Sequence, residues 1–89
     1  MIERHVEIVN RLGLHARAAA KLVQMAAGFD SRLWLLKDGE EVDAKSILGL
    51  LLLAAGQGSR VTLRAEGDDA AEAVDAVATL IADRFHEES

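Results

Sequence analysis

The sequence predicts an α+β fold in which a four-stranded antiparallel sheet carries three helices on one face, in the order βαββαβα. Short segments that alternate apolar and polar residues are interspersed with segments whose apolar residues recur every three or four positions. An Asp-Gly pair at residues 38–39 is typical of a tight hairpin, which makes its two strands antiparallel. The residues expected on the open, wet face of the sheet are Glu3, His5, Glu7, Arg60, Thr62 and Arg64.

The first strand is expected at residues 2–9, because Val6 and Ile8 alternate with polar neighbours. The first helix is expected to begin near His15, where alanines follow, and to end at Gly28. Its predicted buried stripe consists of Ala19, Leu22, Val23 and Ala26, and its polar side carries Arg17, Lys21 and Gln24.

Residues 32–37 and 40–43 are expected to form the hairpin strands on either side of the Asp-Gly pair. Leu33 and Leu35 fall on one face of the first strand, and Trp34 falls on the other. A lone aromatic residue in a strand favours packing or an edge position over a stacking platform for a base or sugar.

Ser46 occupies an N-cap position before a short helix at residues 47–53, in which nearly every side chain is apolar. A helix lying on a sheet buries one side, so Leu50 and Leu53 are expected to face inward. The remaining leucines and isoleucine then form an exposed apolar group, which usually marks an interaction site. The predicted partner-binding residues are Lys21, Gln24, Ile47, Leu48 and Leu51.

The last strand is expected at residues 60–65, after the glycine-rich segment 56–58 that closes the short helix. Asp69 and Glu72 have the spacing of a capping box, which predicts the start of the last helix. Residues 86–89 are expected to be frayed, as chain ends usually are.

The composition of the 89 residues excludes several classes of function and predicts one domain, 1–89. The chain has no cysteine, and His5, His15 and His86 lack the spacing of a zinc site, so neither a metal nor a cofactor is expected. A net charge of −5 argues against nucleic-acid binding. The chain has neither a signal-peptide pattern nor an apolar run of about 20 residues, which predicts a cytoplasmic protein without membrane insertion.

Ser46 and its neighbours also fail two catalytic patterns. They lack the Gly-x-Ser-x-Gly elbow of a Ser-His-Asp hydrolase, and the small chain offers little room for a substrate pocket. The glycines of a P-loop are likewise missing before Lys45.

His15 is the candidate for chemistry, because residues 8–29 contain three basic residues and no carboxylate. A histidine at a helix start lies beside unpaired backbone N–H groups and the positive end of the helix dipole. Arg17 can supply paired donors to phosphate oxygens. Phosphoryl transfer through histidine needs a neutral imidazole, groups that hold the anion, and no nearby base that activates water. The local sequence meets these demands, although His15 as an unusual cap beside a solvated Arg17 remains the alternative.

Two segments, NRLGLHAR at residues 10–17 and KSILG at 45–49, resemble the HPr family of histidine-containing phosphocarriers of the bacterial phosphoenolpyruvate-dependent phosphotransferase system. The resemblance extends over nearly the whole chain. It implies an open-faced β-sandwich, phosphorylation of His15 on Nδ1 by Enzyme I, and delivery to IIA domains. It further implies that Arg17 holds the phosphate and that Ser46 is a regulatory serine phosphorylated by HPr kinase/phosphorylase.

The resemblance implies a monomeric phosphoryl carrier, which differs from a classical turnover enzyme. One departure is Ala18, where the family usually has proline, and a helix tolerates proline in its first turn without requiring it. The branch of the system, sugar uptake or nitrogen-related, stays open. The alternative function is a regulatory protein-binding module of the nitrogen-related branch, which docks through the helix after Ser46 and does not need His15.

Overall fold

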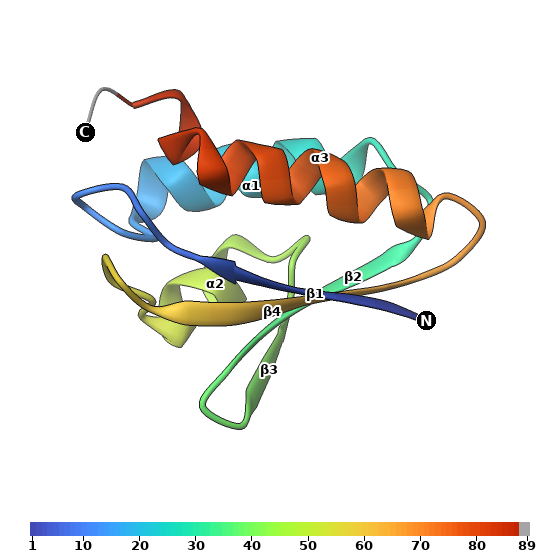
Figure 1. Cartoon of the computed structure of the whole chain (residues 1–89), viewed down its shortest axis with the longest axis horizontal. Helices are drawn as coiled ribbons and strands as arrows, with labels where there is room; N and C mark the ends of the chain where they lie inside the picture. The colour runs from blue at the N-terminus through green and yellow to red at the C-terminus, as the bar shows by residue number, and fades with distance from the viewer. Residues whose placement is uncertain (88–89) are drawn as a thin grey trace.

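The computed structural model describes residues 1–87 and has the predicted order of elements (Figure 1). The strands are β1 (Ile2–Glu7), β2 (Arg32–Lys37), β3 (Glu40–Asp43) and β4 (Arg60–Glu66). The helices are α1 (Ala16–Ala27), α2 (Ile47–Leu53) and α3 (Ala70–Ala82), followed by a 3-10 turn, η1 (Arg84–His86). Among residues 1–87, no helix combines the length and the apolar composition that crossing a bilayer requires.

The four strands form one antiparallel sheet in the order β1-β4-β2-β3, which confirms the predicted fold class. Helices α1 and α3 lie side by side over one face of this sheet (Figure 1). Helix α2 packs against α1 and β3, beside the start of α1. In the part of the chain that the structure describes, the opposite face of the sheet is left open.

The strand register puts polar residues on the open face, as predicted. Glu3 pairs with Arg64, and His5 pairs with Thr62 across β1 and β4. The guanidinium of Arg64 contacts Glu3 at 2.6 Å and Glu41 at 3.1 Å. Salt bridges at such exposed positions contribute little, so this face is a solvated surface and adds little to the core.

The core lies between the sheet and the helices. Leu33 and Leu35 point into it, which leaves Trp34 half-buried on the open side. Leu50 and Leu53 of α2 are buried, as predicted. The largest fully buried side chains include Ile8, Leu22, Leu33, Leu35, Leu50, Leu63, Ile81 and Phe85.

The predicted capping box at the start of α3 is wrong. Asp69 makes no side-chain hydrogen bond to its own helix. Its carboxylate instead accepts hydrogen bonds from the backbone N–H groups of Asp30 and Ser31, each at 2.9 Å, and from the Ser31 hydroxyl. The fold brings the turn between α1 and β2 against the start of α3, and donors there compete successfully for the carboxylate. Asp69 thus fastens two distant loops together.

Replacement of Asp69 by Asn is expected to lower the urea midpoint of unfolding at pH 7, because the amide replaces a charged acceptor. The Ser31 hydroxyl and the backbone N–H of Asp30 lower the pKa of Asp69 below its ordinary 3.8. A lowered pKa in the folded state means that the stabilisation is present above pH 3.8 and is lost as the pH falls further. The difference from the wild-type midpoint should therefore shrink in acid, with the exposed neighbour Asp68→Asn as control. A difference that is constant from pH 7 to pH 2 would contradict this role.

Two chain segments end differently from the prediction. Helix α2 closes at Ala54, which has a left-handed backbone (φ 54°), before the glycines at residues 56–58 are reached. The tail is not frayed at His86 and Glu87, because Phe85 is fully buried and anchors it. The last two residues of the predicted frayed segment, 88–89, lie outside the described residues.

Candidate functional site

His15 is fixed by the loop that precedes α1. Gly13 has a left-handed backbone (φ 66°), and a Cβ atom added to it would lie 2.7 Å from the carbonyl oxygen of Ala55. The next residue, Leu14, donates its N–H to the same oxygen at 2.8 Å. The loop is therefore pressed against the segment that follows α2, and this contact holds His15 in place.

The ring of His15 caps α1, as the sequence predicted. Its backbone is extended, and Nδ1 accepts a long hydrogen bond of 3.3 Å from the backbone N–H of Arg17. The N–H groups at this helix start have no partners inside the helix, which makes the place favourable for an anion. Ala18 is fully buried in the first turn, so the helix forms without the family's proline.

His15 and Arg17 line one shallow depression of the surface. The Arg17 side chain is exposed, so its guanidinium is free to turn toward an anion there. Among residues 1–87, those that line this depression are Leu12, His15, Ala16, Arg17, Lys21, His86 and Glu87. The fold thus brings the two predicted residues, His15 and Arg17, to one depression, and it adds His86 and Glu87, which the sequence did not place there.

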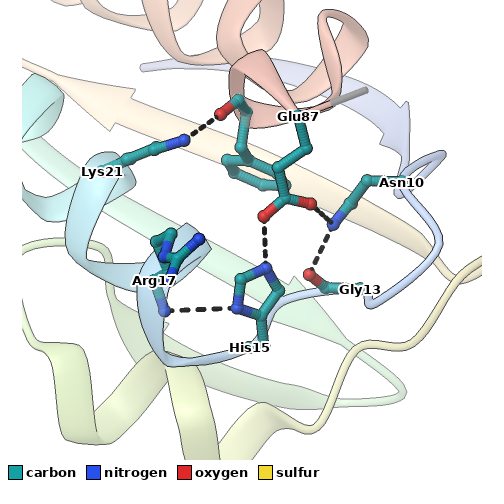
Figure 2. A network of polar contacts seen from close by, with 7 residues as sticks. Asn10, Gly13, His15, Arg17, Lys21 and Glu87 are labelled. Carbon is teal, nitrogen blue, oxygen red and sulfur yellow. Dashed lines mark hydrogen bonds and ion pairs between the residues drawn. The ribbon is translucent and has the colours of Figure 1, made fainter. Parts of the chain in front are cut away.

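The second ring nitrogen of His15 faces a carboxylate from the end of the chain (Figure 2). Nε2 lies 2.5 Å from Oε2 of Glu87. The other carboxylate oxygen, Oε1, accepts a hydrogen bond of 3.1 Å from Nδ2 of Asn10. The same amide nitrogen donates to the carbonyl oxygen of Gly13 at 2.8 Å. Asn10, which is fully buried, thus ties the carboxylate to the loop that positions His15.

The expectation that no carboxylate lies near His15 is wrong, because Glu87 contacts its ring. The prediction counted neighbours in sequence, whereas the fold brings in a residue 72 positions away. Burial alone would raise the pKa of Glu87, but hydrogen bonds from His15 and Asn10 and the nearby positive charges more than offset this and lower it. Glu87 is therefore ionised at neutral pH. It lies at Nε2, on the opposite edge of the ring from Nδ1, so it does not face a group bound to Nδ1.

Lys21 is engaged with the same end of the chain. Its Nζ atom donates to the carbonyl oxygen of Phe85 at 2.6 Å, and its charge helps to lower the pKa of Glu87. The side chain that was predicted to meet a partner therefore also holds the tail in position. Gln24, one turn further along α1, is exposed as expected.

The exposed apolar side of α2 is present as predicted. Ile47 is 43% exposed, Leu48 68% and Leu51 38%, and Leu52 adds a further apolar side chain. We call these four residues the α2 patch. Leu12, in the loop before His15, is also largely exposed and was absent from the predicted partner-binding set.

Ser46 caps α2 as predicted. Its hydroxyl oxygen accepts a hydrogen bond of 3.1 Å from the backbone N–H of Gly49. The residue is half-buried and immediately precedes the α2 patch. A charge added at Ser46 would therefore lie next to that apolar surface.

The three histidines have separate partners. His5 contacts Thr62, His86 contacts Asp83, and His15 contacts Glu87. Within residues 1–87, no three side chains of the kinds that bind metals converge on one point.

Two residues of the site were not predicted from the sequence, namely Glu87 and the structural role of Asn10. In the sequence, Asn10 stands out only as the first residue of the NRLGLHAR segment at residues 10–17. A usable signal for Glu87 was available in Phe85, which continues the apolar spacing of Val77 and Ile81 at the end of α3. A buried aromatic residue at this point predicts that the tail turns back onto the core.

Comparisons of the sequence and the structure with known proteins all point to one group of proteins. The family model described as the PTS HPr component phosphorylation site matches residues 2–83. Phosphocarrier protein HPr of Cupriavidus necator is 54% identical over 87 residues, which are 98% of each chain. The solved HPr of Thermoanaerobacter tengcongensis has a TM-score of 0.96 and 49% identity, with 100% of both chains covered. Crh of Bacillus subtilis, a catabolite repression protein solved as a dimer with a swapped domain, has a TM-score of 0.77 and 44% identity over 94% of this chain and 97% of its own.

Proposed function

The chain belongs to the HPr family of phosphocarrier proteins, and we propose that it accepts a phosphoryl group from Enzyme I on His15 and passes it to IIA domains of the phosphotransferase system. The family implies partners of this system in general. The observation that supports the assignment to His15 is the position of Nδ1, which lies at the start of α1 in a depression shared with Arg17.

The transfer breaks the bond between phosphorus and Enzyme I and forms a bond between phosphorus and Nδ1 of His15. Nδ1 of His15 attacks the phosphorus of the phosphoryl group carried by Enzyme I, and the donor atom of Enzyme I leaves with the electron pair of the broken bond. The unpaired N–H groups of α1 and the guanidinium of Arg17 hold the phosphoryl oxygens. Delivery to a IIA domain reverses this step. The protein is thus a carrier between proteins, and no cofactor takes part.

The proposed partner surface joins the α2 patch to the basic side of α1. It contains Lys21, Gln24, Ile47, Leu48 and Leu51. Exposed apolar side chains beside Arg17 and Lys21 suit partners with an apolar centre and acidic groups around it. In this proposal the protein acts in the cytoplasm as a monomer and binds neither nucleic acid nor a membrane. Sedimentation at the protein concentration of the transfer assay tests whether the protein is a monomer.

The transfer is tested by incubation with phosphoenolpyruvate and Enzyme I. We expect one acid-labile phosphate per chain on the wild type and none on His15→Ala. Addition of a IIA domain should then remove the phosphate from the wild type. Equal labelling of the wild type and His15→Ala, or no labelling of either, would contradict the proposal.

We further propose that HPr kinase/phosphorylase modifies Ser46 and that this modification slows transfer. A phosphate there puts negative charge beside the α2 patch, where acidic partners would be repelled. Ser46→Asp should therefore be phosphorylated more slowly by Enzyme I. Ser46→Ala is the control, because it also removes the cap of α2 but adds no charge. Loss of the cap should lower the free energy of unfolding by about 1 kcal/mol. Identical rates for both variants would refute the electrostatic role of Ser46.

The exposed α2 patch also favours a second function, that of a regulatory binding module of the nitrogen-related branch, which docks through α2. Its signature is a partner that binds His15→Ala as tightly as the wild type and loses affinity when Leu48 is replaced by Ser. A phosphocarrier, in contrast, needs both His15 and the α2 patch, because loss of His15 abolishes transfer and loss of Leu48 weakens docking.

A further inference from the structure

We infer that Glu87 is a positioning residue, which holds the proton of His15 on Nε2 and so keeps the lone pair on Nδ1. The inference rests on the proposed function of His15, and it identifies what selects the reacting nitrogen. Three independent features carry it: the two partners of the ring, the support of the carboxylate, and the strained backbone that brings Glu87 to the site.

The two partners of the ring require the same tautomer. A neutral imidazole has one N–H group and one nitrogen lone pair. The ionised carboxylate of Glu87 can only accept, so it favours the proton on Nε2 at 2.5 Å. The backbone N–H of Arg17 can only donate, so it favours the lone pair on Nδ1 at 3.3 Å. Both contacts therefore prepare Nδ1 as the nucleophile. The 3.3 Å bond is long, and it is easily given up when phosphorus approaches.

The carboxylate also matches the charge that forms during transfer. When Nδ1 bonds to phosphorus, the ring keeps its Nε2 proton and gains a positive charge. Glu87 then faces this charge directly, as the carboxylate partner does for the histidine of serine proteases. On delivery, the electron pair of the broken bond returns to Nδ1 and the ring becomes neutral again. Within the described residues, 1–87, the other charged or titratable side chains around the depression are Arg17, Lys21 and His86.

Asn10 fixes the carboxylate from its far side. Its Nδ2 donates to both the Gly13 carbonyl and Oε1 of Glu87, and the side chain is fully buried (Figure 2). The carboxylate therefore has one oxygen for Asn10 and one for His15. A glutamine at position 87 would offer a single acceptor oxygen for these two donors.

The backbone that delivers Glu87 is strained. Arg84, Phe85 and His86 have φ values of 56°, 53° and 64°, and none of them is glycine. Successive left-handed residues of this kind are unfavourable and persist only where other contacts enforce them. The enforcing contacts are the buried ring of Phe85 and the hydrogen bond from Lys21 to its carbonyl oxygen. Such strain concentrates at functional sites, and here it points a carboxylate at Nε2.

The tautomer is tested by the ¹⁵N chemical shifts of the His15 ring, measured above the pH at which the ring protonates. We expect the wild type to show a protonated Nε2 and an unprotonated Nδ1. In Glu87→Gln the two shifts should move toward each other, as the tautomers mix. Glu66→Gln, which removes the same charge from the exposed end of β4, is the control and should match the wild type.

The rate of phosphorylation by Enzyme I is the second measurement on the same variants. Glu87→Gln should be slower by roughly 10- to 100-fold, by analogy with the loss seen when the partner that orients a metal-bound histidine is removed. Glu87→Asp should recover part of this loss, because it keeps an ionised acceptor. Glu66→Gln should react at the wild-type rate.

The outcomes separate the two proposals. A change in tautomer together with a slower rate supports the role of Glu87. An unchanged tautomer, or an unchanged rate, in Glu87→Gln overturns it even if the wild type is phosphorylated normally. If the wild type is not phosphorylated at all, the proposed function fails, and with it the role of Glu87 in transfer.

Discussion

Gly13→Ala is expected to lower the free energy of unfolding by about 2–4 kcal/mol, the sum of backbone strain and steric overlap. Gly13 has φ 66°, a conformation that disfavours alanine. The added methyl group would also lie 2.7 Å from the Ala55 carbonyl oxygen and 2.8 Å from Cα of Gly56. Both neighbours are backbone atoms, so neither can move aside without shifting the loop. Urea unfolding at neutral pH measures the loss.

Gly39→Ala is the matched control for Gly13. Gly39 also has a positive φ of 83°, but a Cβ atom there meets nothing within 4 Å. Gly39→Ala should therefore lower the free energy of unfolding only through backbone strain, by about 1–2 kcal/mol. An equal loss in the two variants would show that the contact between the Gly13 loop and the segment after α2 does not matter.

Arg17→Ala is expected to slow phosphorylation of His15 by roughly 100-fold, comparable to the loss of one charge-stabilising donor from an active site. The guanidinium provides two parallel donors to phosphoryl oxygens, which no neighbour in the first turn of α1 replaces. Because the Arg17 side chain is exposed, the fold should be unaffected. Transfer from Enzyme I under single-turnover conditions gives the rate.

Two further variants make the Arg17 experiment specific. Arg17→Lys keeps the charge without the paired donors and should fall between the wild type and Arg17→Ala. Arg11→Ala removes an exposed charge from the same basic segment and should have a small effect. If Arg11→Ala were as slow as Arg17→Ala, general charge attraction would account for the role assigned to Arg17.

The sequence predicted the fold because its signals are local. Alternation along β4, the Asp-Gly turn at residues 38–39 and the apolar stripe of α1 each act within a few residues, and all agree with one sheet. Leu50 and Leu53 were correctly placed inward for the same reason. Helical periodicity decides which side of α2 is buried without knowledge of the rest of the chain.

The sequence did not predict the contacts that join distant segments. Asp69 has the spacing of a cap, yet donors at Asp30 and Ser31 take its carboxylate once the two loops meet. Glu87 was assigned to a frayed tail, yet the buried Phe85 brings it to His15. The spacing of residues along the sequence cannot show which of several possible partners binds a carboxylate, because the distances to distant partners are set by the completed fold. His15 and Arg17 can therefore be proposed as site residues from the sequence, whereas the contacts of Asn10 and Glu87 with the His15 loop and ring emerge only from the structure.

The proposed role of His15 is tested most directly by the position of the phosphate on the protein phosphorylated by Enzyme I. Coupling between ³¹P and ¹⁵N in the His15 ring identifies the bonded nitrogen. We expect phosphorus on Nδ1, with the proton retained on Nε2 beside Glu87. Phosphorus on Nε2, or on any residue other than His15, would contradict it.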